Sequence, residues 1–184
     1  MKVLVATQKP FAAVAVKGIK EIVEAAGYEF ALLEKYEQTS ELLAAVADAD
    51  ALIVRSDKVT AEVVEAAKNL KIVVRAGAGY DNLDLAACTA HGVVAMNTPG
   101  QNSNAVAELA VAMMIFMART QFTPATGSEI QGKTVGIQAF GNVGRLVGRK
   151  AAALGMKVKA IDPFLTPEQI VAGGAEPAES LEAL

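Results

Sequence analysis

Short β-branched runs alternate with stretches of helical periodicity through the first hundred residues of this 184-residue chain. The runs predict strands at Lys2–Ala6, Tyr28–Leu33, Ala51–Val54, Lys71–Val74 and Val93–Ala95. Helices with an alanine-rich face are predicted between them, at Phe11–Ala26, Ser40–Ala47, Ala61–Ala67 and Leu83–His91. Alternation of this kind is typical of βαβ units, whose strands pair in parallel and carry helices on their faces. We therefore predict an α/β domain with a parallel sheet over residues 1–100.

The rest of the chain predicts a second, incomplete α/β unit. A turn-rich stretch, Asn97–Asn102, precedes a long helix at Asn104–Arg119, and residues 120–132 break the apolar pattern as a linker would. The elements expected after it are a strand at Thr134–Gln138, a helix at Val143–Leu154, a strand at Lys157–Ile161 and helical fragments at Pro167–Ala172 and Ala178–Leu184, with no third strand. The predicted organisation is a domain over 1–100, a linking helix and linker over 101–132, and a partial unit over 133–184.

The charge balance and the reactive residues exclude several classes of protein. Seventeen basic and 20 acidic residues give a net charge of −3, which argues against a nucleic-acid or membrane surface. The longest apolar run, Leu109–Ala118, is about half of what a bilayer span needs. One cysteine, Cys88, and one histidine, His91, make neither an internal disulfide nor a zinc site. We expect a cytoplasmic protein, with small molecules or protein as partners.

Basic side chains follow the predicted strands of the first domain. They are Lys9, Arg55, Lys58 and Arg75. In an open parallel sheet, ligands bind beyond the carboxyl ends of the strands. The loop after Arg75 contains Gly77 and Gly79, which let successive backbone N–H groups point at one carboxylate or phosphate oxygen. We infer a small, multiply charged anion as ligand; the alternative is that Arg55 and Arg75 are surface charges paired with Asp57 and Asp81.

A glycine turn between the strand at 134–138 and the next helix resembles the dinucleotide-binding pattern G-x-G-x-x-G. Ala139 stands at the first glycine position, Gly141 at the second and Gly144 at the third. Gly141 would let a pyrophosphate approach the backbone, and Gly144 would let the helix pack close to the strand. Asp162, at the end of the following strand, is placed to bind the adenosine ribose and favours NAD over NADP. The alternative is a glycine turn that serves only packing.

Several ordered motifs together resemble the D-2-hydroxyacid dehydrogenases. They are Val54-Arg55-Ser56, Arg75-Ala76-Gly77-Ala78-Gly79-Tyr80-Asp81-Asn82, Asn97-Thr98-Pro99-Gly100, Gly141-Asn142-Val143-Gly144 and Asp162-Pro163. The resemblance covers nearly the whole chain and implies a flavodoxin-like substrate domain followed by the first half of a Rossmann NAD-binding domain. Within the family, the chain looks most like members that oxidise 3-phosphoglycerate in serine biosynthesis.

The resemblance also implies a role for individual residues. Arg55 and Ser56 would face the substrate phosphate, and the backbone of Ala76 and Gly77 would hold the carboxylate. The residues expected at the substrate are Arg55, Ser56, Arg75, Ala76, Gly77 and Asn102. Ala78 would lie beside the nicotinamide, and the other residues expected at the cofactor are Gly141, Asn142, Val143, Gly144 and Asp162.

The catalytic groups of the family do not match any residue of this sequence. They are an arginine and a histidine with its glutamate partner, and His91 does not occupy that histidine's position. We therefore expect a partial chain that is inactive alone. Two other hypotheses remain: a non-catalytic module that binds an anion or nucleotide, and a self-associating scaffold. A homodimer is expected, formed through the helix at 104–119 or the half Rossmann unit, because unpaired apolar strand edges promote association.

Overall fold

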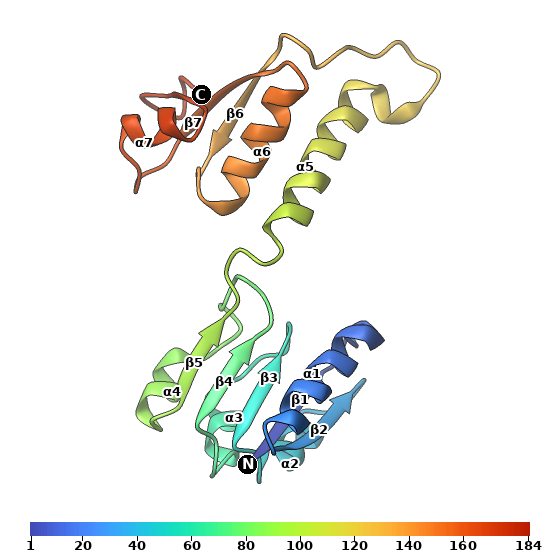
Figure 1. Ribbon diagram of the computed structural model, residues 1–184, viewed down its shortest axis with the longest axis vertical. Helices are drawn as coiled ribbons and strands as arrows, with labels where there is room; N and C mark the ends of the chain where they lie inside the picture. The colour runs from blue at the N-terminus through green and yellow to red at the C-terminus, as the bar shows by residue number, and fades with distance from the viewer. The chain divides into compact units, whose positions relative to one another are not determined.

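The computed structural model describes residues 1–184, which divide into two compact units, Met1–Pro99 and Gly100–Leu184 (Figure 1). Strands and helices alternate along both units, so the predicted α/β class is confirmed. The helix that was predicted to link two domains lies wholly within the second unit. None of the helices combines the length and the apolar character that a membrane span requires.

A five-stranded parallel sheet forms the first unit, in the order β2-β1-β3-β4-β5. The strands are β1 (Lys2–Thr7), β2 (Glu29–Glu34), β3 (Ala51–Val54), β4 (Ile72–Arg75) and β5 (Val94–Asn97). This is the flavodoxin-like order, in which the direction of winding reverses between the first and third strands. Every strand lies within two residues of its predicted range, because strands that are buried on both faces read as continuous apolar runs.

Helices cover both faces of this sheet. They are α1 (Ala13–Ala25), α2 (Thr39–Val46), α3 (Ala61–Ala66) and α4 (Leu85–Ala90). Leu4, Leu52 and Val73 point to one face, where they form the main core with residues of α2, α3 and α4. Val3 and Ala51 point to the other face and pack against α1, as the alternation of side chains along a strand requires.

The second unit contains a three-stranded parallel sheet in the order β6-β7-β8. Its elements are α5 (Ser103–Ala118), a 3-10 turn η1 (Thr120–Phe122), β6 (Thr134–Gln138), α6 (Asn142–Ala153), β7 (Lys157–Ile161), α7 (Pro167–Ala172) and β8 (Glu176–Pro177). Phe140 is fully buried at the core of this unit. Ala107 of α5 and Ala151 of α6 lie in the same apolar cluster, so α5 is part of the packed unit.

Two predictions for the tail are wrong. A third strand is present, because β8 pairs with β7 in the register Lys159 to Glu176 and Ala160 to Pro177. Two residues, one of them a proline without an N–H, carry no strand signal in the sequence. Residues 178–184 form turns and no helix. Such a segment is too short to hold a helix without packing, and Leu184 instead lies against the backbone of Gly136 in β6.

Candidate functional sites

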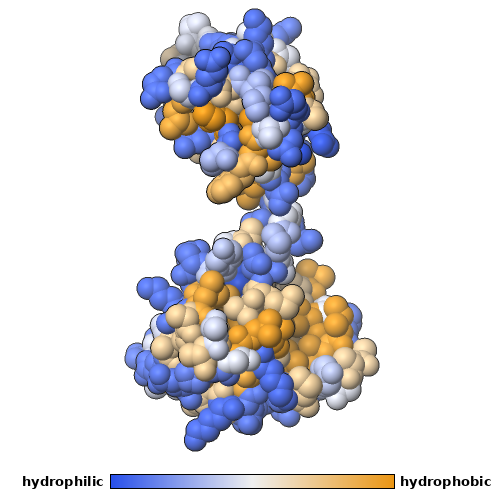
Figure 2. All heavy atoms as spheres, turned by 90° about the vertical axis from the view of Figure 1, so that its left-hand side faces the viewer, coloured by the Kyte–Doolittle hydropathy of each residue, from blue (hydrophilic) through white to orange (hydrophobic).

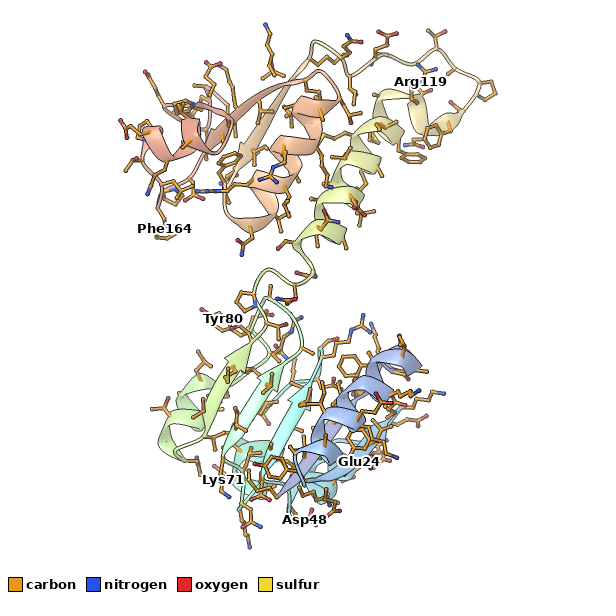
Figure 3. The ribbon with its side chains drawn as sticks, in the orientation of Figure 1. Glu24, Asp48, Lys71, Tyr80, Arg119 and Phe164 are labelled. Carbon is orange, nitrogen blue, oxygen red and sulfur yellow. The ribbon has the colours of Figure 1, made fainter.

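The carboxyl edge of the first sheet brings two of the predicted basic residues together. Val54, Arg75 and Asn97 occupy the same register level on β3, β4 and β5, so the loops that follow them are neighbours. The Nε of Arg75 donates a hydrogen bond of 2.9 Å to the backbone carbonyl of Arg55. Tyr80, in the loop after β4, lies at this edge, whereas Asp48 and Lys71 lie at the opposite end of the sheet (Figure 3). The expected clustering of Arg55 and Arg75 is thus present in the fold.

Neither arginine is neutralised by a carboxylate. No ion pair of the structure includes Arg55 or Arg75. Asp57 is buried, with 6% of its surface exposed, and accepts hydrogen bonds from the Gln8 backbone and the Tyr36 hydroxyl. The alternative that Asp57 and Asp81 pair with the two arginines is therefore wrong. Both guanidinium groups keep donors for an anionic ligand.

The loop after β4 has fewer free backbone N–H groups than the sequence predicted. The Ala76 N–H donates to the Val54 carbonyl, and the Gly77 N–H donates to the Arg75 carbonyl, each at 2.8 Å. The Arg75 guanidinium also occupies the space that a Cβ on Gly77 would need, so a larger residue there would displace this side chain. The N–H groups of Ala78 and Gly79 have no partner in the structure and are the backbone donors that remain for a ligand.

Ser56 and Asn102 were also predicted at the substrate. Ser56 lines a cavity of about 380 Å³ that neither Arg55 nor Arg75 lines. Asn102, which was assigned to the substrate, is the N-cap residue of α5 in the second unit. Asn97 belongs to a matched motif but was not among the predicted substrate residues; its side-chain amide donates to the Ala78 carbonyl at 2.7 Å and fixes the loop. Its position at the end of β5 was the available signal.

The predicted dinucleotide fingerprint forms a tight turn between β6 and α6. Ala139 has a φ of +72°, the left-handed region that favours glycine, and its N–H donates to the Ile161 carbonyl at 2.9 Å. A Cβ on Gly144 would collide with the carbonyl oxygen of Ala139. The third glycine position is thus fixed by the close approach of helix to turn, as predicted, while an alanine occupies the first.

The start of α6 has the properties that a pyrophosphate group requires. No heavy atom lies within 4 Å of the position that a Cβ on Gly141 would take, so the backbone is open to a ligand at this point. The first helical hydrogen bond is donated by Arg145 to Gly141, which leaves the N–H groups of Asn142, Val143 and Gly144 free. Free N–H groups and the helix dipole together attract a phosphate oxygen.

Asp162 lies where the sequence placed it and also holds the turn together. Its Oδ2 accepts from the Phe140 N–H at 2.7 Å, and its Oδ1 accepts from the Phe164 N–H at 2.8 Å. Each carboxylate oxygen has two lone pairs, so both can still accept a ribose hydroxyl. These residues fit a dinucleotide, and those that would hold it are Gly141, Asn142, Val143, Gly144 and Asp162.

A cavity of about 350 Å³ adjoins this turn, and some of its lining residues were not among the predicted cofactor residues. Gly141, Asn142 and Asp162 were predicted at the cofactor. The remaining lining residues are Phe140, Arg145, Phe164 and Leu165. Arg145 donates from Nε to the Phe140 carbonyl at 3.0 Å and lies over the Phe140 ring. Phe164 is 91% exposed (Figure 3). Its position two residues after Asp162 could have indicated that it lies at the proposed cofactor site.

The single histidine and the single cysteine of the chain have positions that support the fold. His91 is the C-cap residue of α4, and its Nδ1 lies 2.9 Å from the Ala87 carbonyl oxygen. Cys88 is buried in the main core, and burial, with a smaller contribution from Asp84, raises the pKa of its thiol. Neither is arranged as an acid, base or nucleophile.

The fold and the glycine turn define an α/β protein with a dinucleotide-type site, and comparison with known proteins gives its family. Residues 5–184 match the family model of the D-isomer specific 2-hydroxyacid dehydrogenase catalytic domain, and the chain belongs to this family.

Individual relatives make the likeness more specific. The D-3-phosphoglycerate dehydrogenase of Rattus norvegicus is 43% identical over 151 residues, which are 74% of this chain and 28% of that protein. The hydroxypyruvate reductase of Thermotoga maritima is 40% identical over 150 residues, 73% of this chain and 49% of that protein. The crystal structure of NAD+-bound 3-phosphoglycerate dehydrogenase from Entamoeba histolytica superimposes with a TM-score of 0.90 and 48% identity, over 99% of this chain and 58% of that one. The chain thus spans between about a quarter and three fifths of the relatives that it matches.

Proposed function

We propose that residues 1–184 provide substrate- and cofactor-binding parts of an NAD-dependent dehydrogenase that oxidises a phosphorylated D-2-hydroxyacid, 3-phosphoglycerate. The observation that carries this proposal is the pair Arg55 and Arg75 at the carboxyl edge of the first sheet: the Arg75 side chain donates to the Arg55 backbone carbonyl, and neither guanidinium pairs with a carboxylate. A phosphorylated hydroxyacid carries two anionic groups, and two guanidinium forks on adjacent loops match that charge.

The proposed substrate contacts follow the matched motifs. Arg55 and Ser56 would face the phosphate, and Arg75 with the loop 76–79 would face the carboxylate. Because the N–H groups of Ala76 and Gly77 already donate to the carbonyls of Val54 and Arg75, we assign the backbone contacts to Ala78 and Gly79. Asn102 remains a proposed substrate residue on the resemblance alone.

For the cofactor, we propose NAD held by the N–H groups at the start of α6 and by the Asp162 carboxylate. When bound, NAD accepts the hydride that leaves the substrate carbon. Asp162 accepts hydrogen bonds from ribose hydroxyls and repels a 2′-phosphate, so it favours NAD over NADP. Support comes from the open backbone at Gly141 and from the NAD+-bound relative.

Oxidation of a hydroxyl also requires a group that takes its proton. His91 is the single histidine, and its ring is bonded to the Ala87 carbonyl at the C-terminal end of α4. We therefore propose that a polypeptide of residues 1–184 binds its ligands without turnover. The measurement is reduction of NAD in the presence of 3-phosphoglycerate; turnover by this polypeptide would contradict the proposal.

The binding site is tested by calorimetric titration with 3-phosphoglycerate and with NAD. Arg55→Ala should weaken 3-phosphoglycerate binding by roughly 10- to 100-fold, the effect of a hydrogen bond to a charged group, and leave NAD binding unchanged. Lys17→Ala, which removes an exposed charge from α1, is the matched control and should change neither. Equal losses for both ligands in Arg55→Ala would refute the assignment.

The same titration separates two substrate classes. Phosphoglycerate dehydrogenases and a hydroxypyruvate reductase are similarly identical to this chain. If the arginines bind a phosphate, 3-phosphoglycerate should bind more tightly than glycerate or hydroxypyruvate. If the unphosphorylated acids bind equally well, the phosphate contact is wrong.

We also propose a homodimer and a cytoplasmic location. The dimer is supported by apolar side chains that α5 leaves exposed, and the location by a buried cysteine that forms no disulfide.

A further inference from the structure

The cavity of about 380 Å³ in the first unit lies at the point where its sheet reverses direction. Gln8 follows β1, and Ser56, Asp57 and Lys58 follow β3, the two strands between which the order reverses. The other lining residues are Tyr36, Thr39, Leu42, Thr60, Glu62 and Val63. Open α/β sheets bind ligands at such reversal points, and the volume lies within the range of small-molecule sites, about 300 to 1,000 Å³.

Asp57 is the buried charge of this cavity. Only 6% of its surface is exposed. Its Oδ1 accepts from the Gln8 N–H and from the Tyr36 hydroxyl, each at 2.7 Å. Burial, together with Asp57 itself, raises the pKa of Tyr36, so the phenol remains a donor. Oδ2 accepts no hydrogen bond in the structure. Because Oδ2 has no partner and yet is not among the fully buried unpartnered side-chain oxygens, it is in contact with solvent and can accept a hydrogen bond from a ligand.

The remaining groups of the cavity define the ligand further. Asp57 and Glu62 are negative and Lys58 is positive, and none of them takes part in an ion pair. The hydroxyls of Ser56 and Thr60 are also without partners; Thr60 is the N-cap residue of α3 but makes no capping bond. The negative excess attracts an ammonium group, while the lysine and the hydroxyls offer partners to a carboxylate.

We propose that this cavity binds a small α-amino acid, with its ammonium group on Oδ2 of Asp57 and its carboxylate toward Lys58. This ligand differs from the proposed substrate. Arg55 and Arg75 do not line the cavity, and a phosphorylated hydroxyacid, which carries only negative charge, would be repelled by Asp57 and Glu62. Ser56 lines the cavity and is also assigned to the proposed phosphate contact, so glycine and 3-phosphoglycerate are compared in the same variants.

The test is calorimetric titration of the full chain, without NAD, using glycine and alanine as probes. Both should bind with saturation at millimolar concentrations, and N-acetylglycine, which lacks the ammonium group, should not bind. Asp57→Asn keeps an oxygen for Gln8 and Tyr36 but replaces the free oxygen by an amide, and it should weaken glycine at least tenfold. Failure of glycine and alanine to saturate would overturn the proposal.

Lys58→Met provides a second variant at an exposed position that does not threaten folding. This variant should bind glycine several-fold more weakly, and its affinity for methylamine, which has no carboxylate, should be unchanged. Unchanged glycine binding in this variant contradicts the proposed orientation. Arg55→Ala should bind glycine normally while losing 3-phosphoglycerate; loss of both ligands would mean that the two sites are one.

Discussion

Among single residues, Ala139 has a backbone conformation that is unfavourable for alanine, and it lies in the turn between β6 and α6. It has a φ of +72° at the first turn of the fingerprint, where the left-handed conformation costs an alanine about 1–2 kcal/mol. Glycine pays no such penalty, although it loses more chain entropy on folding. The turn therefore retains its shape at a local cost in stability.

Ala139→Gly should raise the free energy of unfolding by about 0.5–1 kcal/mol. The bond from residue 139 to Ile161 uses the backbone N–H, so it is retained. Chemical denaturation of the two proteins provides the measurement. Ala152→Gly, in the regular helix α6, is the matched control and should lower stability by about 1 kcal/mol. Loss of stability in both variants would show that Ala139 is unstrained.

At the third glycine position, Gly144, a substitution should lower the stability rather than raise it. A Cβ there would meet the Ala139 carbonyl, so Gly144→Ala should cost about 1–3 kcal/mol. Gly18 lies in α1 with no heavy atom within 4 Å of a Cβ, and Gly18→Ala should stabilise by up to about 1 kcal/mol. Thermal unfolding distinguishes the two variants: the melting temperature should fall in Gly144→Ala and rise in Gly18→Ala. A shift of both melting temperatures in the same direction would contradict the close contact between Gly144 and the Ala139 carbonyl.

Residue positions were predictable from the sequence where a local motif fixes them, and not where distant elements meet. Gly141 and Asp162 belong to one βαβ unit, so spacing alone placed them. Pairing with Arg55 was the alternative considered for Asp57, because the two residues are neighbours in sequence. The burial of Asp57 depends on Tyr36 and on the end of β1, which only the assembled sheet brings to it.

At the scale of elements, Asp50 joins three strands at the amino end of the first sheet. It precedes β3, and its carboxylate accepts from the Lys2 backbone N–H at the start of β1 and from the Lys71 side chain before β4, at 2.8 and 3.0 Å. These contacts, the backbone bond first, lower the pKa of Asp50 below its ordinary value of 3.8.

A carboxyl whose pKa is lowered on folding contributes stability above its unfolded value and loses it as pH falls through the folded value. Asp50→Asn should therefore be less stable than the natural chain at pH 7, and the difference should shrink below about pH 4. Urea denaturation at several pH values measures this. Glu65→Gln removes an exposed carboxylate of α3 that makes no ion pair and is the matched control. A constant difference for Asp50→Asn would exclude the charge as the cause.

Elements that carry an apolar or β-branched run were predictable even when they are short, and an element without such a run was not. The strands β3, β6 and β7 match their predicted bounds, since each is a run of apolar or β-branched residues. The strand β8 forms only because β7 offers an open edge to Glu176 and Pro177. Pairing with a partner distant in sequence leaves no local pattern.

At the scale of the whole molecule, helix α5 has two apolar faces. Ala107 and Ala110 lie in the core of the second unit. The adjacent side of the helix exposes large apolar side chains at near-heptad spacing, namely Val106, Leu109, Met113, Phe116 and Met117. The first unit also exposes Leu85, Val94 and Met96, on the side that carries α4 and β5 (Figure 2). A helix that is apolar all round is normally covered, which supports the proposed homodimer through α5.

Leu109→Lys should shift the chain from dimer to monomer, because a charge on the exposed stripe of α5 would be desolvated in a dimer interface. Leu109 is 62% exposed, so the change should not disturb the fold of the unit. Light scattering across micromolar concentrations gives the mass, and circular dichroism confirms the helices. Val14→Lys, at an 80% exposed position of α1, is the control and should remain dimeric. If the natural chain is a monomer at all these concentrations, the dimer proposal fails; if Leu109→Lys stays dimeric, α5 is not the interface.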